Sequence, residues 1–217
     1  MSLPAAVLWD MDGTLVDSEP YWMDAETQLV EEWGGTWTHE DAMQCVGSGL
    51  ERSALIIQSR GVELSVDEII ATMTDRVLTR IRQEVPWRPG ARELLQSIKA
   101  AGVPTALVTM SIGRMARHVA DSLGFDGFDV VVPGDEVEHP KPHPAPYLRA
   151  AELLGVDIRD CVALEDSEPG AASAVAAGAR VVAVPLHIPL PPSSRYELRD
   201  TLVGVTVADL PTGVRTP

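Results

Sequence analysis

A short stretch near the N-terminus decides the expected fold: residues 5–14 read AAVLWDMDGT. An apolar run with the composition of a buried strand ends in two carboxylates, Asp10 and Asp12. Period-2 geometry directs both carboxylates to one side of an extended backbone, where their charges repel. A divalent cation would stabilise such a pair, because Mg²⁺ prefers carboxylate and carbonyl oxygens. Gly13 then permits a tight turn, although a strand that ends in an ordinary Asp-Gly turn is the alternative.

The same arrangement, an apolar run followed by polar residues, recurs along the chain. Further apolar runs cover 103–108, 129–132, 161–164 and 180–184, and helical patterns cover about 90–100, 111–123, 144–154 and 168–177. Strands that alternate with helices predict an α/β fold with a Rossmann-like parallel sheet and helices on both faces. Asp10, Thr109 and Asp166 follow such runs, which is where ligands bind in open α/β sheets.

Residues 18–85 interrupt this alternation. Helical patterns begin after Pro20, which can start a helix, and continue over about 50–60 and 66–83 without a convincing strand. The sequence therefore predicts two domains. Residues 1–17 and 86–217 form the core, and residues 18–85 form a small all-helical insertion after the first strand.

Residues 10–19, DMDGTLVDSE, resemble the first motif of the haloacid dehalogenase superfamily, in its phosphatase and β-phosphoglucomutase-like branch. Three further motifs of that family have counterparts here. They are a strand ending in Thr109, a loop that holds Lys141, and a strand ending in Glu165 and Asp166. On these motifs the chain is identified as a member of the superfamily. The helical insertion resembles the family's cap domain, which closes over the site and selects the substrate.

The resemblance implies a role for each matched residue. Asp10 would be the nucleophile that forms an aspartyl phosphate, and Asp12 would be the general acid and base. Thr109 and Lys141 would bind the phosphoryl group. A single Mg²⁺ would be the cofactor, and its expected ligands are Asp10, Asp12, Asp166 and Glu165, the last either directly or through water.

Composition independently supports a role for Lys141. The chain contains 17 basic Lys and Arg residues, and among them only Lys99 and Lys141 are lysines. Lys141 lies in the proline-rich loop HPKPHP, residues 139–144. Lys supplies a compact point charge, whereas Arg supplies a planar fork of donors. A chain that otherwise favours Arg therefore indicates a specific need for an ammonium group here, with chance placement as the alternative.

These motifs predict a hydrolase, a phosphatase that acts on a small phosphorylated metabolite such as a sugar phosphate. A sugar phosphomutase of the β-phosphoglucomutase type uses the same core and is the alternative, as is a non-catalytic phosphate-binding protein. The candidate substrate-specificity residues of the cap are Gly47, Ser48, Gly49 and Arg52, for which an ordinary helix–helix loop is the other interpretation. This loop lacks the Lys that mutase caps use to hold a second phosphate, which favours the phosphatase, with substitution by Arg76 or Arg80 as the alternative.

Charge and hydropathy limit the partners. The net charge of −15 argues against nucleic acids and anionic membranes as partners. No stretch approaches the roughly 20 apolar residues that span a bilayer, and the first strand begins too close to Met1 for a signal peptide. Cys45 and Cys161 fall in different substructures, so both are predicted to be free thiols in a cytoplasmic protein. The sequence makes no prediction of the oligomeric state.

Overall fold

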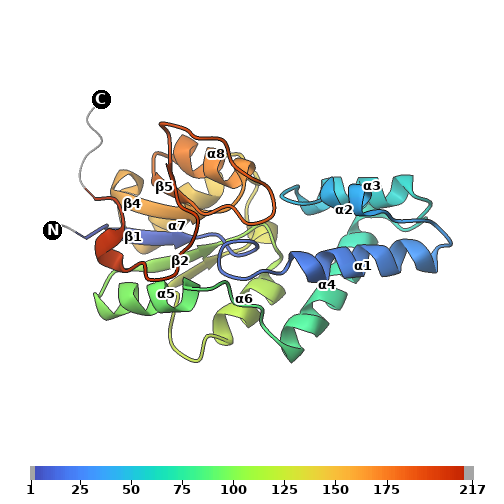
Figure 1. The fold of residues 1–217 in the computed structure, drawn as a ribbon, viewed down its shortest axis with the longest axis horizontal. Coiled ribbons are helices and arrows are strands. Elements are labelled where there is room, and N and C mark those ends of the chain that lie inside the picture. The colour runs from blue at the N-terminus through green and yellow to red at the C-terminus, as the bar shows by residue number, and fades with distance from the viewer. Residues whose placement is uncertain (1–2, 213–217) are drawn as a thin grey trace. The chain divides into compact units, whose positions relative to one another are not determined.

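Two units make up this computed structural model, which describes residues 3–212 (Figure 1). The first unit comprises Met1–Val16 and Trp87–Pro217, and the second comprises Asp17–Pro86. These bounds differ by one residue from those expected for the core and the helical insertion.

The first unit is built on a single parallel sheet. Its strands are β1 Ala6–Trp9, β2 Thr105–Val108, β3 Val130–Val132, β4 Cys161–Glu165, β5 Arg180–Ala183 and β6 Glu197–Leu198. Their order across the sheet is β3-β2-β1-β4-β5-β6. Val7 of β1 pairs with Thr105 of β2 on one side and with Val162 of β4 on the other, so β1 is an interior strand. The predicted α/β fold is confirmed, and only the short edge strand β6 was not expected.

Helices cover both faces of this sheet (Figure 1). They are α5 Ala91–Ala100, α6 Gly113–Asp121, α7 Ala145–Leu154 and α8 Glu168–Ala177, and short 3-10 turns span Gly134–Glu136, Ile158–Asp160 and Val207–Asp209. Helices α7 and α8 pack on the face that carries Ala6 and Leu8 of β1, whereas α5 and α6 lie on the opposite face (Figure 1). Successive β1 residues point to opposite faces, and all four are fully buried, as a sheet covered on both sides requires.

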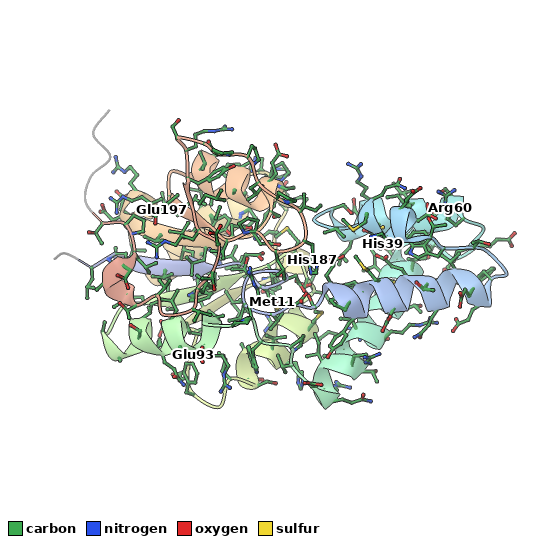
Figure 2. All side chains as sticks on the ribbon, in the orientation of Figure 1. Met11, His39, Arg60, Glu93, His187 and Glu197 are labelled. Atoms are coloured by element: carbon green, nitrogen blue, oxygen red, sulfur yellow. The ribbon has the colours of Figure 1, made fainter. Side chains whose placement is uncertain are left out.

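The second unit is helical. Its helices are α1 Glu19–Glu32, α2 His39–Met43, α3 Leu50–Ser59 and α4 Val66–Gln83, of which α2 was not expected. Helices α1 and α3 pack against α4. Thr38 before α2 and Ser65 before α4 each form a capping box with the acidic residue three positions on. Arg60, which follows α3 (Figure 2), forms an ion pair with Asp41 of α2.

The two chain segments that cross between the units pair with each other. Val16 forms an antiparallel bridge with Trp87, and the backbone N–H of Arg88 donates to the carbonyl oxygen of Leu15 at 3.0 Å. The chain therefore leaves the first unit and re-enters it at one place.

Among the helices of residues 3–212, none combines the length and the apolar character that crossing a bilayer requires. Both cysteines are free, as expected, and both are buried, with Cys45 in the second unit and Cys161 at the start of β4.

Candidate active site

Polar side chains gather where three adjacent strands of the sheet end. Asp10 and Asp12 follow β1, Thr109 follows β2, and Glu165 and Asp166 stand at the end of β4. Parallel strands present their carboxyl ends at one edge, so residues more than a hundred positions apart in the chain meet there. The central position of β1 between β2 and β4 brings these three strand ends together.

The loop after β1 is a tight turn fixed by Gly13. The N–H of Gly13 donates to the carbonyl of Val16 at 2.8 Å, and fully buried Met11 anchors the loop (Figure 2). Gly13 has a φ of 86°, and a Cβ at this position would lie 2.0 Å from Oδ2 of Asp166. Both the backbone conformation and the lack of space therefore require glycine. The turn holds the residues after β1 directly against the carboxylate that follows β4.

Asp10 is buried at the centre of this edge, with 7% of its surface exposed. Its Oδ1 accepts a hydrogen bond from Nζ of Lys141 at 2.7 Å, whereas its Oδ2 is buried and has no hydrogen-bond partner among the described residues. Burial, with a smaller upward contribution from Glu165, raises the pKa of Asp10 to about 7 against the lowering effect of Lys141. One oxygen of this carboxyl is thus held in place, and the other is available to a ligand.

Lys141 connects the carboxylates at this edge. Its Nζ donates to Asp10 Oδ1 at 2.7 Å, to Glu165 Oε1 at 2.7 Å and to the carbonyl of Val108 at 2.9 Å. Burial disfavours the charged ammonium, but the negative charges of Asp10 and Glu165 raise the pKa of Lys141 above its ordinary value. Lys141 therefore stays protonated, and all three of its N–H donors have acceptors.

Glu165 is fully buried, and its Oε1 also accepts a hydrogen bond from the hydroxyl of Tyr147. The Tyr147 ring lies 5.1 Å from Nζ of Lys141. Gly170 at the start of α8 faces the same carboxylate, where a Cβ would lie 1.9 Å from Glu165 Oε2. The position of Glu165 is therefore defined from several sides.

Three carboxylates form a group that fits a divalent cation. Oxygens of Asp10, Glu165 and Asp166 lie within 4.8 Å of one another. Burial raises the pKa of Asp166 well above its ordinary value, as do Asp10 and Glu165, whereas Lys141 and Arg88 lower it. Oxygen donors of this kind suit Mg²⁺, and the unpartnered Oδ2 of Asp10 is the kind of atom that a cation would satisfy.

The carboxylate of Asp12 is bound by hydroxyl groups that follow β2. Its Oδ2 accepts hydrogen bonds from Ser111 Oγ at 2.7 Å and from Thr109 Oγ1 at 3.2 Å. The N–H of Ser111 in turn donates to Thr109 Oγ1 at 2.9 Å. The Asp12 carboxylate therefore faces the end of β2 and is not part of the carboxylate group described above. The expected metal role of Asp12 and the phosphate-binding role of Thr109 both stay predictions.

The candidate specificity residues of the cap lie in the second unit, around the start of α3. Ser48 Oγ donates to the carbonyl of Cys45 at 2.8 Å and shares a hydrogen bond of 2.9 Å with Ser53 Oγ. Gly49 is the residue that precedes α3, and Arg52 is exposed in its first turn. Gly47, with a φ of 69°, turns the chain before them. Their role in substrate selection stays a prediction.

Three residues of this edge were missed by the sequence analysis. Ser111 lies two positions after Thr109 and could have been found from the same period-2 argument that paired Asp10 with Asp12. Tyr147 and Arg88 carry no such signal, because each reaches the edge from another element, α7 and the second crossing segment.

Comparison with known proteins agrees with the geometry. The family model described as haloacid dehalogenase-like hydrolase matches residues 7–184. Hexitol phosphatase B of Escherichia coli (strain K12) is 30% identical over 97% of this chain and 96% of that protein. The bifunctional riboflavin kinase/FMN phosphatase of Arabidopsis thaliana is 31% identical over 84% of this chain, which spans about half (49%) of that protein. The crystal structure of CbbY from Rhodobacter sphaeroides in complex with phosphate superposes with a TM-score of 0.86 and 26% identity, over 96% of this chain and 99% of that one.

These findings confirm the resemblance inferred from the four motifs. The matched region spans the first strand, the helical insertion and the strands that carry the polar edge, and the fold agrees with that of a solved relative over nearly its whole length. The chain belongs to the haloacid dehalogenase-like hydrolases, in the branch of the sugar phosphatases and β-phosphoglucomutase-like proteins, and is an enzyme of the hydrolase class.

Proposed function

We propose that this protein is a Mg²⁺-dependent phosphomonoesterase that acts on a small phosphorylated metabolite, a sugar phosphate, through an aspartyl-phosphate intermediate. The observation that carries the proposal is the state of Asp10. One oxygen of its carboxyl is bound to Lys141, and the other is buried without a partner, beside two more carboxylates. A carboxyl group that Lys141 fixes in one orientation, beside carboxylates that can hold a cation, is suited to act as a nucleophile.

Asp10, Glu165 and Asp166 are the residues that would hold the cation. When bound, Mg²⁺ supplies positive charge that offsets the repulsion between the carboxylates and the phosphoryl oxygens, a large electrostatic requirement of phosphoryl transfer. Lys141 supplies a second positive charge, which the protein itself holds at 2.7 Å from Asp10. Together these positive charges offset the carboxylates of the site, so that it can accept a phosphate despite the net charge of −15.

In the first half-reaction, an Asp10 oxygen bonds to phosphorus and the bond from phosphorus to the ester oxygen breaks. Asp12 gives a proton to the departing alcohol. The hydroxyls of Ser111 and Thr109, at 2.7 and 3.2 Å from Asp12 Oδ2, hold the general acid in one orientation. Lys141 keeps Asp10 oriented for the attack.

In the second half-reaction, Asp12 takes a proton from water. The water oxygen bonds to phosphorus, and the bond between phosphorus and Asp10 breaks. Inorganic phosphate leaves, and Asp10 and Asp12 return to their starting states. The same residue thus acts first as acid and then as base, which a carboxyl held by hydroxyl donors can do without moving.

The relatives support the substrate class. The matched proteins include a hexitol phosphatase and an FMN phosphatase, and the solved CbbY structure contains phosphate. In this chain the residues proposed to select the substrate are Gly47, Ser48, Gly49 and Arg52 of the second unit.

Hydrolysis of p-nitrophenyl phosphate with and without Mg²⁺ tests the proposal, followed by a panel of sugar phosphates and other phosphorylated metabolites. Phosphate release that depends on Mg²⁺ is the expected result. Absence of metal-dependent release on every compound would contradict it and favour a non-catalytic phosphate-binding protein. Glucose 1-phosphate with a bisphosphate activator separates the remaining alternative, because a phosphomutase would form glucose 6-phosphate and a phosphatase would release phosphate.

A further inference from the structure

Arg88 has a place in the site that no motif assigns to it. Only 8% of its surface is exposed. Its Nη1 donates to the carbonyl of Gly13 at 2.6 Å and to the carbonyl of Val184 at 2.7 Å. Burying a guanidinium costs free energy because the charge loses its hydration, so the groups that Arg88 binds must compensate for this cost.

The two acceptors follow two different strands, which are not neighbours in the sheet. Gly13 lies in the loop that follows β1, and Val184 is the residue that follows β5. In the sheet β4 lies between β1 and β5, and Asp166 follows β4. The guanidinium therefore ties together the loops on either side of the strand that carries Asp166.

The contact with Gly13 is the important one, because Gly13 packs directly on Asp166. A Cβ at Gly13 would lie 2.0 Å from Asp166 Oδ2, so the backbone of this loop and the carboxylate leave no room between them. A shift of the loop would move Asp10 relative to Asp166, and these residues form two of the three members of the carboxylate group.

We propose that Arg88 is a positioning residue, whose guanidinium fixes the distance between the Asp10 loop and Asp166 and so holds the cation-binding carboxylates in register. The importance of this role for turnover rests on the proposed function, whereas the effect on the loop does not. Its hydrogen bond to the Gly13 carbonyl lets Arg88 act on the carboxylates through the loop.

A purely electrostatic role of Arg88 and the proposed positioning role predict opposite effects of its removal on the affinity for Mg²⁺. The positive charge of Arg88 is near enough to Asp166 to favour its ionised form. If charge were all that mattered, Arg88→Met would remove a repulsive cation and strengthen Mg²⁺ binding. If Arg88 positions the loop, the same variant loosens the carboxylate group and weakens Mg²⁺ binding. Arg88→Lys keeps the charge without the planar fork, so its affinity for Mg²⁺ should fall between those of wild type and Arg88→Met.

Arg180 provides a matched control. It is also 8% exposed, and its Nη1 donates to a backbone carbonyl, that of Pro211, at 3.4 Å. Arg180 begins β5, at the end of the sheet opposite to the site. Arg180→Met therefore removes a buried guanidinium of equal exposure without touching the Asp10 loop.

The experiment measures three quantities for wild type, Arg88→Met, Arg88→Lys and Arg180→Met. They are hydrogen exchange of the peptide 11–17, the dissociation constant for Mg²⁺ by calorimetry, and kcat and KM for p-nitrophenyl phosphate. For Arg88→Met we expect faster hydrogen exchange in this peptide. Mg²⁺ binding should be about 10- to 100-fold weaker, and kcat should be lower by a similar factor with KM little changed. Arg180→Met should match wild type in all three.

Tighter Mg²⁺ binding by Arg88→Met, or equal effects of the Arg88 and Arg180 variants, would overturn the proposal. If wild type releases no phosphate from any ester, the exchange rate and the metal affinity still decide the role of Arg88. If wild type is active and the Arg88 variants resemble Arg180→Met, the positioning role falls and the proposed function stands.

Discussion

Each unit of this protein buries carboxyl groups, but the two units surround them differently. In the first unit Asp10 and Glu165 share the ammonium of Lys141. In the second unit Glu26 of α1 is only 2% exposed, and no cation among the described residues contributes to its pKa. Its neighbours are the indole of Trp37 and the thiol of Cys45, and its Oε2 has no hydrogen-bond partner among the described residues.

The comparison shows what a charged partner changes. Burial and, to a smaller extent, Glu19 raise the pKa of Glu26 to about 8, and only neutral groups favour the charged form. Burial likewise raises the pKa of Asp10, but Lys141 opposes the shift and limits it to about 7. Lys141 thus keeps Asp10 partly ionised at neutral pH, whereas Glu26, with a pKa of about 8, is mainly protonated.

Asp10→Asn should produce the largest effect. The amide keeps the shape of the side chain but cannot form an acyl phosphate, so kcat should fall by at least about 10⁴-fold. Circular dichroism should show an unchanged fold. Asp126→Asn, at an exposed position of the same unit, is the control and should retain full activity. Substantial turnover by Asp10→Asn in the presence of Mg²⁺ would refute the assigned nucleophile.

Lys141→Arg tests whether the site needs the compact ammonium. The guanidinium keeps the charge but cannot donate three bonds from one atom to Asp10, Glu165 and Val108, so kcat should fall by about 10²- to 10³-fold. Lys99→Arg is a matched control, since Lys99 is the other lysine and forms one partly exposed ion pair with Asp129. Equal activity of both variants would show that any cation suffices.

The pH dependence of stability in Glu26→Gln tests the contrast between the two units. A carboxyl whose pKa rises on folding from 4.5 to about 8 lowers the free energy of unfolding progressively as pH rises through this window. The neutral amide avoids this loss, so the variant should gain on the order of 2 to 4 kcal/mol relative to wild type between pH 5 and pH 8.5. Urea unfolding at both pH values measures the gain.

Two further variants complete this test. Glu31→Gln, at an exposed position of the same helix, should give no pH-dependent gain. Glu165→Gln should lower the free energy of unfolding, because it takes a counter-charge from Lys141. The contrast between the units fails if Glu26→Gln gives the same difference from wild type at both pH values.

Ser65→Ala should have the smallest effect, confined to the second unit. Ser65 accepts the N–H of Glu68 at the start of α4, and loss of such a cap costs about 1 kcal/mol. Hydrogen exchange of α4 peptides should report the change. Ser59→Ala, an exposed hydroxyl at the end of α3, is the control, and comparable exchange in both variants would argue against the capping box as a source of stability.

The sheet and most of the polar edge could be predicted because their signals are local in the sequence. An apolar run marks each buried strand, and the polar residue that follows marks its carboxyl end, which placed Asp10, Thr109, Glu165 and Asp166. The short strand β6 and the five-residue helix α2 were missed, because neither is long enough to display a hydrophobic period.

The remaining parts of the site depend on contacts across the fold. Arg88 and Tyr147 reach the edge from elements that carry no motif. The orientation of Asp12 depends on Ser111, 99 positions away in the chain. Periodicity reports which face of an element is buried, but it does not report which buried donor meets which acceptor.

The bridge between Val16 and Trp87 has a consequence for how such a chain can change. Since the exit and the return are adjacent, the sheet is joined to residues 17–86 much as a strand pair is joined to its loop. The entropic cost of closing a loop grows only with the logarithm of its length. Insertions or replacements between these two positions should therefore leave the pairing of β1 with β2 and β4 nearly untouched, so that the enclosed segment is free to diversify while the chemistry stays constant.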